Sequence, residues 1–229
     1  LISLFCAMNT LNSIDTSKNR KLRYLSCHDN NLTSLNVTNN KKLLILNIAD
    51  NKLSDIDVRG CKNLTRLDIT RNNIETLNIT QNLKLWWLFC ESNKLSSLNL
   101  MNNRKLAKLF CGCNTLSSLD LSNNLELKTL DCRFNKLRQL EFAKNLKIRI
   151  VECNGNYLEK LDISTNTELI KIVCAANCLE NIDVSCNKKL KLLCCDRNVS
   201  LYFGDNKMRL DDPTNEDGVF LLPYICYYR

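Results

Sequence analysis

The stretch that decides the fold is LAKLFCGCNTLSSLDLSNNLE, residues 106–126. The 21 residues before it, LWWLFCESNKLSSLNLMNNRK (85–105), carry the same spacing of leucines, one cysteine and two asparagines. Divided into blocks of 21, the chain repeats the unit L-x-x-L-x-C-x-x-N-x-L-x-x-L-[DN]-[VIL]-x-x-N-x-x from residue 1 to residue 189. A tenth copy starts at residue 190 and loses the pattern after Asn198. A fixed repeat of this length is the sequence signature of a solenoid.

The repeats are regular enough to define one domain. The ninth position is Asn in all ten copies, and the nineteenth is Asn in eight of nine, with Cys61 as the exception. The sixth is Cys in eight of ten, with Ile48 and Ile69 as the exceptions. We expect a solenoid over residues 1–199, with repeats starting at 1, 22, 43, 64, 85, 106, 127, 148, 169 and 190. Residues 200–229 break the period, and we expect them to form a C-terminal capping segment.

The nested unit resembles the cysteine-containing leucine-rich repeats of internalin-type bacterial surface proteins, over residues 1 to about 200. The resemblance implies a mainly β, right-handed leucine-rich repeat solenoid of about ten 21-residue coils with parallel strands. It also implies an extracellular or cell-surface protein of a bacterium. It identifies no ligand, because the repeated residues are scaffold.

Each repeat is expected to form one coil. Positions 1, 4, 6, 11, 14 and 16 are apolar and point inward, and the alternation within each half is that of a strand. We therefore expect an extended segment in both halves of every coil. An Asn side chain offers two donors and one acceptor, so two Asn ladders would satisfy the backbone where each half reverses direction.

The fourteen cysteines have a simple explanation in this scheme. Eight of them occupy the inward sixth position, where isoleucine also occurs: Cys6, Cys27, Cys90, Cys111, Cys132, Cys153, Cys174 and Cys195. We interpret them as buried thiols that pack as small apolar groups. A disulfide among the remaining cysteines is left open. The only histidine, His28, has no second ligand at metal spacing, so we expect no metal site and no cofactor.

No catalytic motif is recognisable: the sequence has no G-x-S-x-G, no glycine-rich phosphate loop and no Cys/His dyad. Carboxylates recur at position 15, but Asn replaces them in three copies, which indicates a turn function. We therefore expect a non-enzymatic chain.

Positions that vary between copies are where function is expected. The outward positions 3 and 5 of the first half carry Trp87 and Phe89 in repeat five and Lys108 and Phe110 in repeat six, whereas repeat seven has Thr129 and Asp131. Exposed aromatic side chains and arginines are typical of contact surfaces. The candidate partner-binding residues are Trp86, Trp87, Phe89, Phe110, Phe134, Arg66 and Lys108, with Arg71 and Arg133 expected around the aromatics. The alternative is structural: the aromatics cover the coil edge or are covered by another domain.

Charge is unevenly distributed. Residues 1–105 have 15 Lys and Arg against 8 Asp and Glu, whereas residues 106–229 have 17 against 16. Many cations fall at repeat ends, and stacking would align them into a basic ridge: Arg20, Lys21, Lys41, Lys42, Lys62, Lys84, Arg104 and Lys105. The ridge serves either solvation or attraction to an anionic glycan or membrane. We expect no nucleic acid partner, because the aromatics do not interleave with the ridge.

The two ends also support expectations. Repeat one begins in phase at Leu1, so we expect an N-terminal cap, and with it a signal peptide, to precede this sequence. The segment VFLLPYICYY (219–228) is apolar enough to cover the last coil, and residues 211–218 are expected to form an exposed loop. No apolar run is long enough to span a bilayer.

The sequence therefore predicts a protein- or glycan-recognition module for surface adhesion or scaffolding, which contacts its partner through the first-half strand face. One alternative is a structural accessory subunit docked permanently in a cell-envelope assembly. Another is the recognition arm of an enzyme whose catalytic domain lies outside this sequence.

Overall fold

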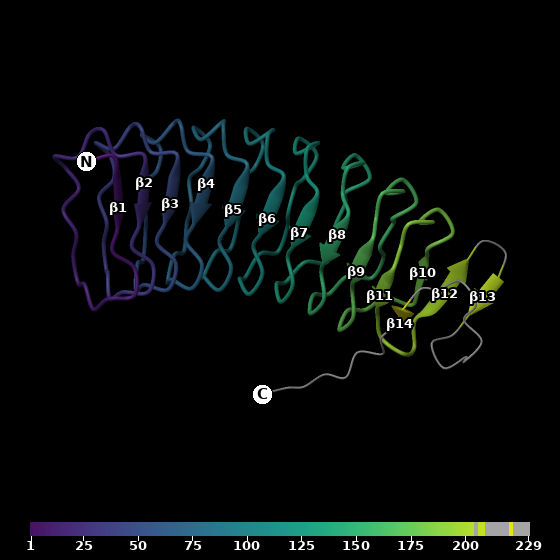
Figure 1. The fold of residues 1–229 in the computed structure, drawn as a ribbon. Helices are drawn as coiled ribbons and strands as arrows, with labels where there is room; N and C mark the ends of the chain where they lie inside the picture. Colours follow the sequence, from purple (N-terminus) through teal and green to yellow (C-terminus); the bar gives the residue numbers. More distant parts are fainter. Residues whose placement is uncertain (204–205, 209–219, 222–229) are drawn as a thin grey trace.

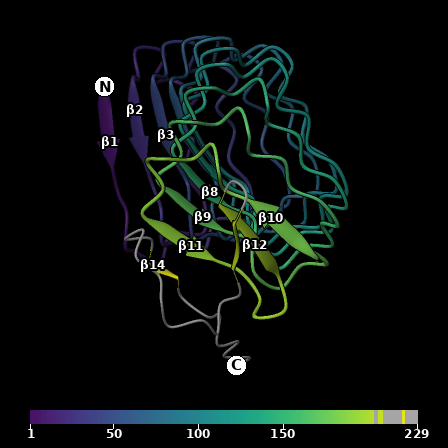
Figure 2. The same ribbon diagram turned by 90° about the vertical axis from the view of Figure 1, so that its right-hand side faces the viewer.

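The computed structural model describes residues 1–203, 206–208 and 220–221. Ten coils stack in sequence order, so neighbouring coils lie side by side along the molecule (Figure 1). Seen along the stack, each coil is one turn of the chain, with its first half on one side and its second half on the other (Figure 2). We number coils and positions within them as in the 21-residue alignment.

The first halves form one parallel sheet. In spatial order its strands are β1 (Ser3–Phe5), β2 (Tyr24–Ser26), β3 (Ile45–Asn47), β4 (Arg66–Asp68), β5 (Trp87–Phe89), β6 (Lys108–Phe110), β7 (Thr129–Asp131), β8 (Ile150–Glu152), β9 (Lys171–Val173), β11 (Leu192–Cys194) and β14 (Phe220–Leu221). From β1 to β11 the strands pair position for position, so that Trp87 lies beside Lys108 and Phe89 beside Phe110. An outward residue therefore has the equivalent residues of the adjacent coils as its neighbours.

The second halves do not form an equivalent sheet. Among the described residues, strand pairing beyond the first sheet is confined to β10 (Asn181–Asp183), β12 (Ser200–Phe203) and β13 (Asn206–Met208). The second halves of the other described coils are therefore not paired as strands, although their sequences alternate as the first halves do. At position 15 the side chain accepts the N–H two residues on, as Asp120 does from Ser122 at 2.9 Å. Asp183 of the paired strand β10 accepts the Ser185 N–H in the same way, at 2.8 Å.

The predicted inward positions form the core. In coils two to nine, positions 1, 4, 6, 11, 14 and 16 are buried, including Leu85, Leu88, Cys90, Leu95, Leu98 and Leu100 of coil five. These side chains make one continuous cluster through the stack. A coil has too little apolar area to fold alone, so stability comes from its contacts with its neighbours.

The position-9 ladder satisfies each Asn side chain from coil two to coil nine. Asn114 accepts the Leu95 N–H of the preceding coil at 3.0 Å. Its amide donates to the carbonyls of Cys90 in that coil and of Cys111 and Gly112 in its own, at 3.0, 3.1 and 3.1 Å. Four bonds from one side chain thus join two coils, and the predicted structural role of the asparagines is confirmed.

The position-19 ladder is less complete. Asn82 donates to Val58 C=O and Cys61 C=O of the preceding coil, but its Oδ1 is buried and has no donor among the described residues. Asn40 differs, because the Thr16 hydroxyl donates to its Oδ1 at 2.8 Å. Cys61 replaces the ladder Asn in coil three, and its thiol contacts Val37 C=O at 3.6 Å.

This difference gives a prediction for position 16. Val58→Thr places a hydroxyl where Thr16 has one, within reach of the unsatisfied Asn82 Oδ1. Because the new bond offsets the burial of the hydroxyl, we expect the free energy of unfolding to change by less than about 0.5 kcal/mol. Val37→Thr is the matched control, since coil three presents Cys61 instead of Asn. That variant should lose about 1–2 kcal/mol. Equal losses in urea unfolding of both variants would contradict the prediction.

Every coil from one to nine turns through a left-handed residue at position 8. In eight of these coils the residue is not glycine, and its φ lies between 51° and 57°, as for Ser92 (52°) and Phe134 (51°). A left-handed non-glycine residue costs about 1 kcal/mol, so the adjacent Asn bonds must offset this strain. Coil eight alone has glycine, Gly155, where an added Cβ would approach the Phe134 ring to 2.4 Å.

The C-terminal segment is described only in part. Ser200–Phe203 pairs with β10, and Phe220–Leu221 pairs with β11 at the end of the large sheet. The expected loop at 211–218, the rest of the apolar segment 219–228 and Cys226 lie outside the described residues. The capping role of 200–229 stays a prediction.

Candidate recognition site

Four of the predicted aromatic residues form one stacked series on the outer face of the sheet. The Trp86 and Trp87 rings stack at 5.5 Å, Phe89 meets Trp87 edge-on at 6.4 Å, and Phe89 stacks on Phe110 at 4.9 Å. We call Trp86, Trp87, Phe89 and Phe110 the aromatic cluster. Its geometry follows from strand alternation, which points positions 3 and 5 outward, and from the pairing of β5 with β6.

Two cations lie on these rings. The Arg66 guanidinium is 5.4 Å from the Trp87 ring centre and 5.0 Å from that of Phe89, and Lys108 Nζ is 4.6 Å from Trp87. Arg66 also contacts Asp68 at 3.6 Å. Cation–π contacts of this kind orient long side chains on a surface. The two residues are the direct strand neighbours of Trp87, on β4 and β6.

The cluster is partly enclosed by its own contacts. Trp86 is 51% exposed, whereas Trp87, Phe89 and Phe110 are half-buried, less exposed than the sequence suggested. Trp87 Nε1 and Arg66 Nε are buried N–H groups without an acceptor among the described residues. One donor belongs to the aromatic cluster and the other to the arginine that packs on it. A buried donor without an acceptor costs free energy, which an acceptor on a bound partner would recover.

Phe134 lies apart from this series. It occupies the left-handed corner of coil seven, is 48% exposed, and its ring covers the space beside Gly155. Among the described aromatic residues it has no ring contact with the cluster. The structure therefore places Phe134 outside the series of ring contacts.

Beside the aromatic cluster lies an ionic network that the sequence analysis did not identify. Arg133 contacts Glu91 at 3.0 Å, Glu152 at 3.3 Å and Asp131 at 3.4 Å, and Lys171 contacts Glu152 at 2.7 Å. Arg133 therefore pairs with carboxylates, and among the described residues it makes no cation–π contact with the aromatic cluster. Arg71 likewise pairs with Asp50 at 3.3 Å. The signal that could have shown the network is Arg133 at position 7 among the acidic residues Glu91, Asp131 and Glu152 at positions 5 and 7 of coils five, seven and eight.

Asp131 is the buried member of this network, with 3% of its surface exposed. Burial raises its pKa to about 6, and the charges of Glu91 and Glu152 add to the rise against the attraction of Arg133. Phe110 is its direct strand neighbour. The sheet face is thus aromatic and cationic over β4–β6 and carries clustered carboxylates with Arg133 and Lys171 over β7–β9.

Asp131→Asn tests this environment. Its folded pKa lies above the unfolded value, so the native state binds more protons between about pH 4 and pH 6, and stability falls as pH rises through that window. The amide keeps an oxygen for the Arg133 N–H, which Asp131 Oδ1 accepts at 3.1 Å. At pH 7.5 the variant should therefore be more stable by roughly 1 kcal/mol. The gain should vanish near pH 4, as measured by denaturant unfolding.

Asp120→Asn is the opposite control. Hydrogen bonds from Ser122 lower the pKa of Asp120, so its contribution is present above its unfolded pKa and is lost as pH falls. This variant should be slightly less stable than the wild type at pH 7.5. If Asp131→Asn is also destabilising at pH 7.5, the assignment of Asp131 as an unfavourable buried charge is wrong.

The repeat-end cations are aligned as the sequence predicted. In the second half of the stack this edge carries ion pairs between adjacent coils, with Lys147 at 2.6 Å from Glu126 and Lys189 in contact with Glu168. The cations of the basic ridge have no ion pair among the described residues, and Lys84 donates to Asn63 at 2.7 Å. The ridge of coils one to five therefore keeps its positive charge.

The thiols of the cysteine ladder are structural. From coil two onward they are buried, and all eight are free. Burial raises the pKa of Cys27, Cys153 and Cys195 to about 12 and the pKa of Cys132 well above its ordinary value. None carries an appreciable thiolate at neutral pH, which is the form needed for nucleophilic attack. Cys61, Cys113, Cys178 and Cys186 are also free thiols, so no disulfide joins these four. Within the described ranges, no group of three His, Cys, Asp or Glu side chains is placed to hold a metal.

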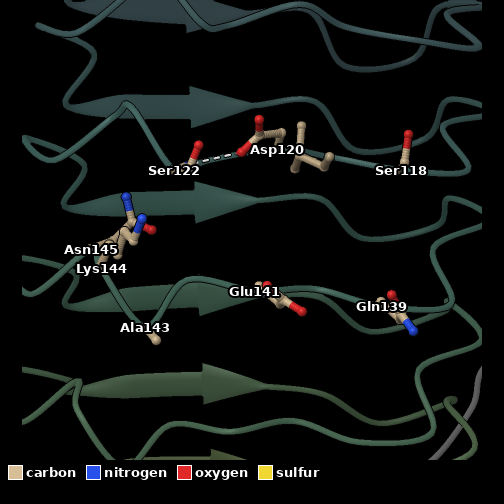
Figure 3. Close-up of a pocket in the computed structure, with 9 residues that line it drawn as sticks. Ser118, Asp120, Ser122, Gln139, Glu141, Ala143, Lys144 and Asn145 are labelled. Carbon is tan, nitrogen blue, oxygen red and sulfur yellow. Dashed lines mark hydrogen bonds between the residues drawn. The ribbon is translucent and has the colours of Figure 1, made fainter.

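A shallow hollow on the second-half side is a further concave feature. It lies between coils six and seven, and Figure 3 shows Ser118, Asp120 and Ser122 on one coil opposite Gln139 and Glu141 on the next. Asp120 is engaged by Ser122, and Glu141 is an exposed carboxylate. The hollow contains no paired acid and base with an orienting third group, so it has no recognisable catalytic geometry.

A parallel solenoid of 21-residue coils with leucine at the core positions defines a leucine-rich repeat protein. No family profile matches the chain, and comparison with curated proteins found no match. Among solved structures, the functional domain of InlJ from Listeria monocytogenes, which includes a cysteine ladder, has a TM-score of 0.89 and 32% identity. The match covers 97% of this chain and 48% of that domain, so the chain spans about half its length.

Two other structures show the same fold at lower identity. A leucine-rich repeat protein of Leptospira interrogans has a TM-score of 0.83 at 16% identity, covering 95% of this chain and 59% of that one. Internalin C2 of Listeria monocytogenes has 0.73 at 21%, covering 76% and 80%. The chain is an internalin-like leucine-rich repeat protein with a cysteine ladder. No helix of its described part is long and apolar enough to cross a membrane.

Proposed function

We propose that this chain is a non-enzymatic recognition module that binds a protein or glycan partner through the outer face of the large sheet. The contact is centred on the aromatic cluster, with Arg66 and Lys108 beside it and Phe134 at the periphery. The observation that carries the proposal is the series of ring contacts Trp86–Trp87–Phe89–Phe110, on positions where several other coils, coil seven among them, have polar residues. The fold does not require aromatics there, and aromatic side chains with arginine dominate binding hot spots.

The unsatisfied donors support the same surface. Trp87 Nε1 and Arg66 Nε are buried within the cluster and lack acceptors among the described residues. A partner that supplies a carbonyl, hydroxyl or carboxylate oxygen would satisfy them while covering the rings. The carboxylates over β7–β9 would set the orientation of the partner through charge complementarity.

The likeness to InlJ from Listeria monocytogenes supports a proposal for the cellular setting. We place the protein on the surface of, or secreted by, a bacterium, where it serves adhesion or scaffolding. The absence of recognisable catalytic geometry in the described part agrees with a binding role.

Fluorine NMR tests the contact directly. The chain has two tryptophans, and both lie in the cluster. Protein labelled with 5-fluorotryptophan therefore gives two signals, which Trp86→Phe assigns. A partner captured from the native source should shift and broaden the Trp87 signal on titration. If a saturating partner leaves both signals unchanged, it binds elsewhere and the proposed site is wrong.

A further inference from the structure

A hollow at the edge of the sheet forms a second candidate site, next to the aromatic cluster. It is lined by Thr65, Lys84, Trp86, Lys105 and Glu126, which come from coils four to six. Trp86 occupies position 2, where the neighbouring coils have Thr65 and Ala107. Trp87 stacks against the Trp86 indole, yet Trp86 keeps 51% of its surface exposed.

The charge around the exposed indole is positive. Lys84 is the last residue of coil four and Lys105 is the last residue of coil five, so Trp86 lies between them in the sequence. Both lysines line the hollow with Trp86. Lys105 has no ion pair among the described residues, and Lys84 bonds only the neutral Asn63. Glu126, the one carboxylate of the hollow, pairs with Lys147 of the following coil at 2.6 Å. Two ammonium groups are therefore available to a ligand that packs on the indole.

We propose that this hollow binds a sugar ring of an anionic polysaccharide, with the flat C–H face of the ring on Trp86 and its carboxylate or sulfate on Lys84 and Lys105. Packing the C–H face on the indole removes apolar area from water. Charge-assisted bonds from the ammonium groups fix the acidic substituent. The Thr65 hydroxyl donates to Leu44 C=O at 3.0 Å, so its oxygen remains an acceptor for a sugar hydroxyl.

The shape of the surrounding charge favours a polymer. From the hollow the basic ridge continues over coils three, two and one through Lys62, Lys42 and Lys21. Coils follow one another at about 4.8 Å, so the ridge presents cations at regular short intervals. A chain with an acidic group on successive sugars matches such a row better than a single small anion.

The observations favour a polysaccharide over single-stranded nucleic acid. Nucleic acid needs several aromatic platforms interleaved with the basic track, and the hollow has one. The remaining rings of the aromatic cluster stack on one another on the sheet face. Nucleic acid is therefore the rival outcome of the test.

The test measures binding of polygalacturonate by isothermal titration, with uncharged dextran as the neutral control. We expect the wild type to bind polygalacturonate with an affinity that falls as salt rises, and not to bind dextran. Trp86→Thr, which introduces the residue of coil four, should weaken binding about 10-fold or more. The double variant Lys84→Gln with Lys105→Gln should weaken polygalacturonate binding and reduce its dependence on salt, because fewer counterions are displaced.

Two variants make the result specific to the hollow. Lys189→Gln removes the same charge at the same repeat position, but from a cation already paired with Glu168, far along the stack from the hollow. It should leave affinity within 2-fold of the wild type, about the smallest difference worth interpreting. Phe110→Asp removes the ring of the aromatic cluster that stacks on Phe89 and not on Trp86, so it impairs the proposed recognition site but not this hollow. Equal losses of affinity from Lys189→Gln and Lys105→Gln would mean that only net charge matters, and would overturn the proposal. Tighter binding of poly-uridine, lost in Trp86→Thr, would overturn it in favour of nucleic acid.

Discussion

Asn114→Ala is expected to lower the free energy of unfolding by about 3 kcal/mol or more. The change deletes four hydrogen bonds and leaves the Leu95 N–H buried without a partner, while the Cys90 carbonyl keeps only the Asn93 amide. It also removes the side chain that holds the left-handed residue Cys113 in place (φ 53°). Each unsatisfied buried group costs about 1–3 kcal/mol, and the effects fall on two coils at once. Urea unfolding followed by circular dichroism measures the loss.

Asn103→Ala is the matched comparison in the other ladder. Asn103 donates to Ile79 C=O at 3.2 Å and to Asn82 C=O at 3.1 Å, while its Oδ1 has no partner among the described residues. Because the wild type already has one unsatisfied atom there, the substitution should cost less, about 1–2 kcal/mol. Losses of the same size at both positions would mean that the completeness of the position-9 ladder does not matter. A negligible loss at Asn114 would refute its role altogether.

Much of this fold could be predicted because the sequence repeats. A residue type that recurs at one position in ten coils must satisfy the same surroundings each time, so the inward positions, the asparagines and the thiols were identified without coordinates. The second half was predicted less well. Alternation of Leu98 and Leu100 with polar residues indicated a strand, but the pattern did not show that, among the described residues, second halves pair as strands only at β10 and β12.

The candidate site was predictable only in outline. Strand alternation and register place Trp87, Phe89 and Phe110 together, and the cations on their rings are direct strand neighbours. The left-handed corner that holds Phe134 was not predicted, because residue preference does not mark position 8: of the nine corners, one has glycine. The ion pairs of Arg133 were not predicted, because its partners Glu91, Asp131 and Glu152 come from three different coils. Charge counts do not show with which of several acidic neighbours a long basic side chain forms an ion pair.

The pair Trp87→Thr and Phe89→Asp is expected to separate folding from binding. These are the residues that coil seven carries at the same positions, as Thr129 and Asp131, so the backbone accommodates them. The variant loses three ring contacts and the cation contacts of Arg66 and Lys108. Each aromatic pair contributes about 0.5–1.5 kcal/mol, and the new carboxylate partly compensates the two cations. We therefore expect a loss of roughly 2 kcal/mol in stability with the fold intact.

The loss of partner affinity should be much larger than the loss of folding stability can explain. Residues at the centre of a contact contribute about 2 kcal/mol or more each, so partner affinity should decrease at least about 30-fold. The control pair Ser118→Thr and Gln139→Asp introduces the same residue types at exposed positions of the second-half side. It makes the same change in net charge and should bind like the wild type.

The most direct test of recognition through the aromatic face is the partner affinity of these three proteins at a temperature where melting curves show all of them folded. The account predicts unchanged affinity for the Ser118/Gln139 control and at least about a 30-fold loss for Trp87→Thr with Phe89→Asp. A folded Trp87/Phe89 variant that binds the partner as tightly as the wild type would contradict the account.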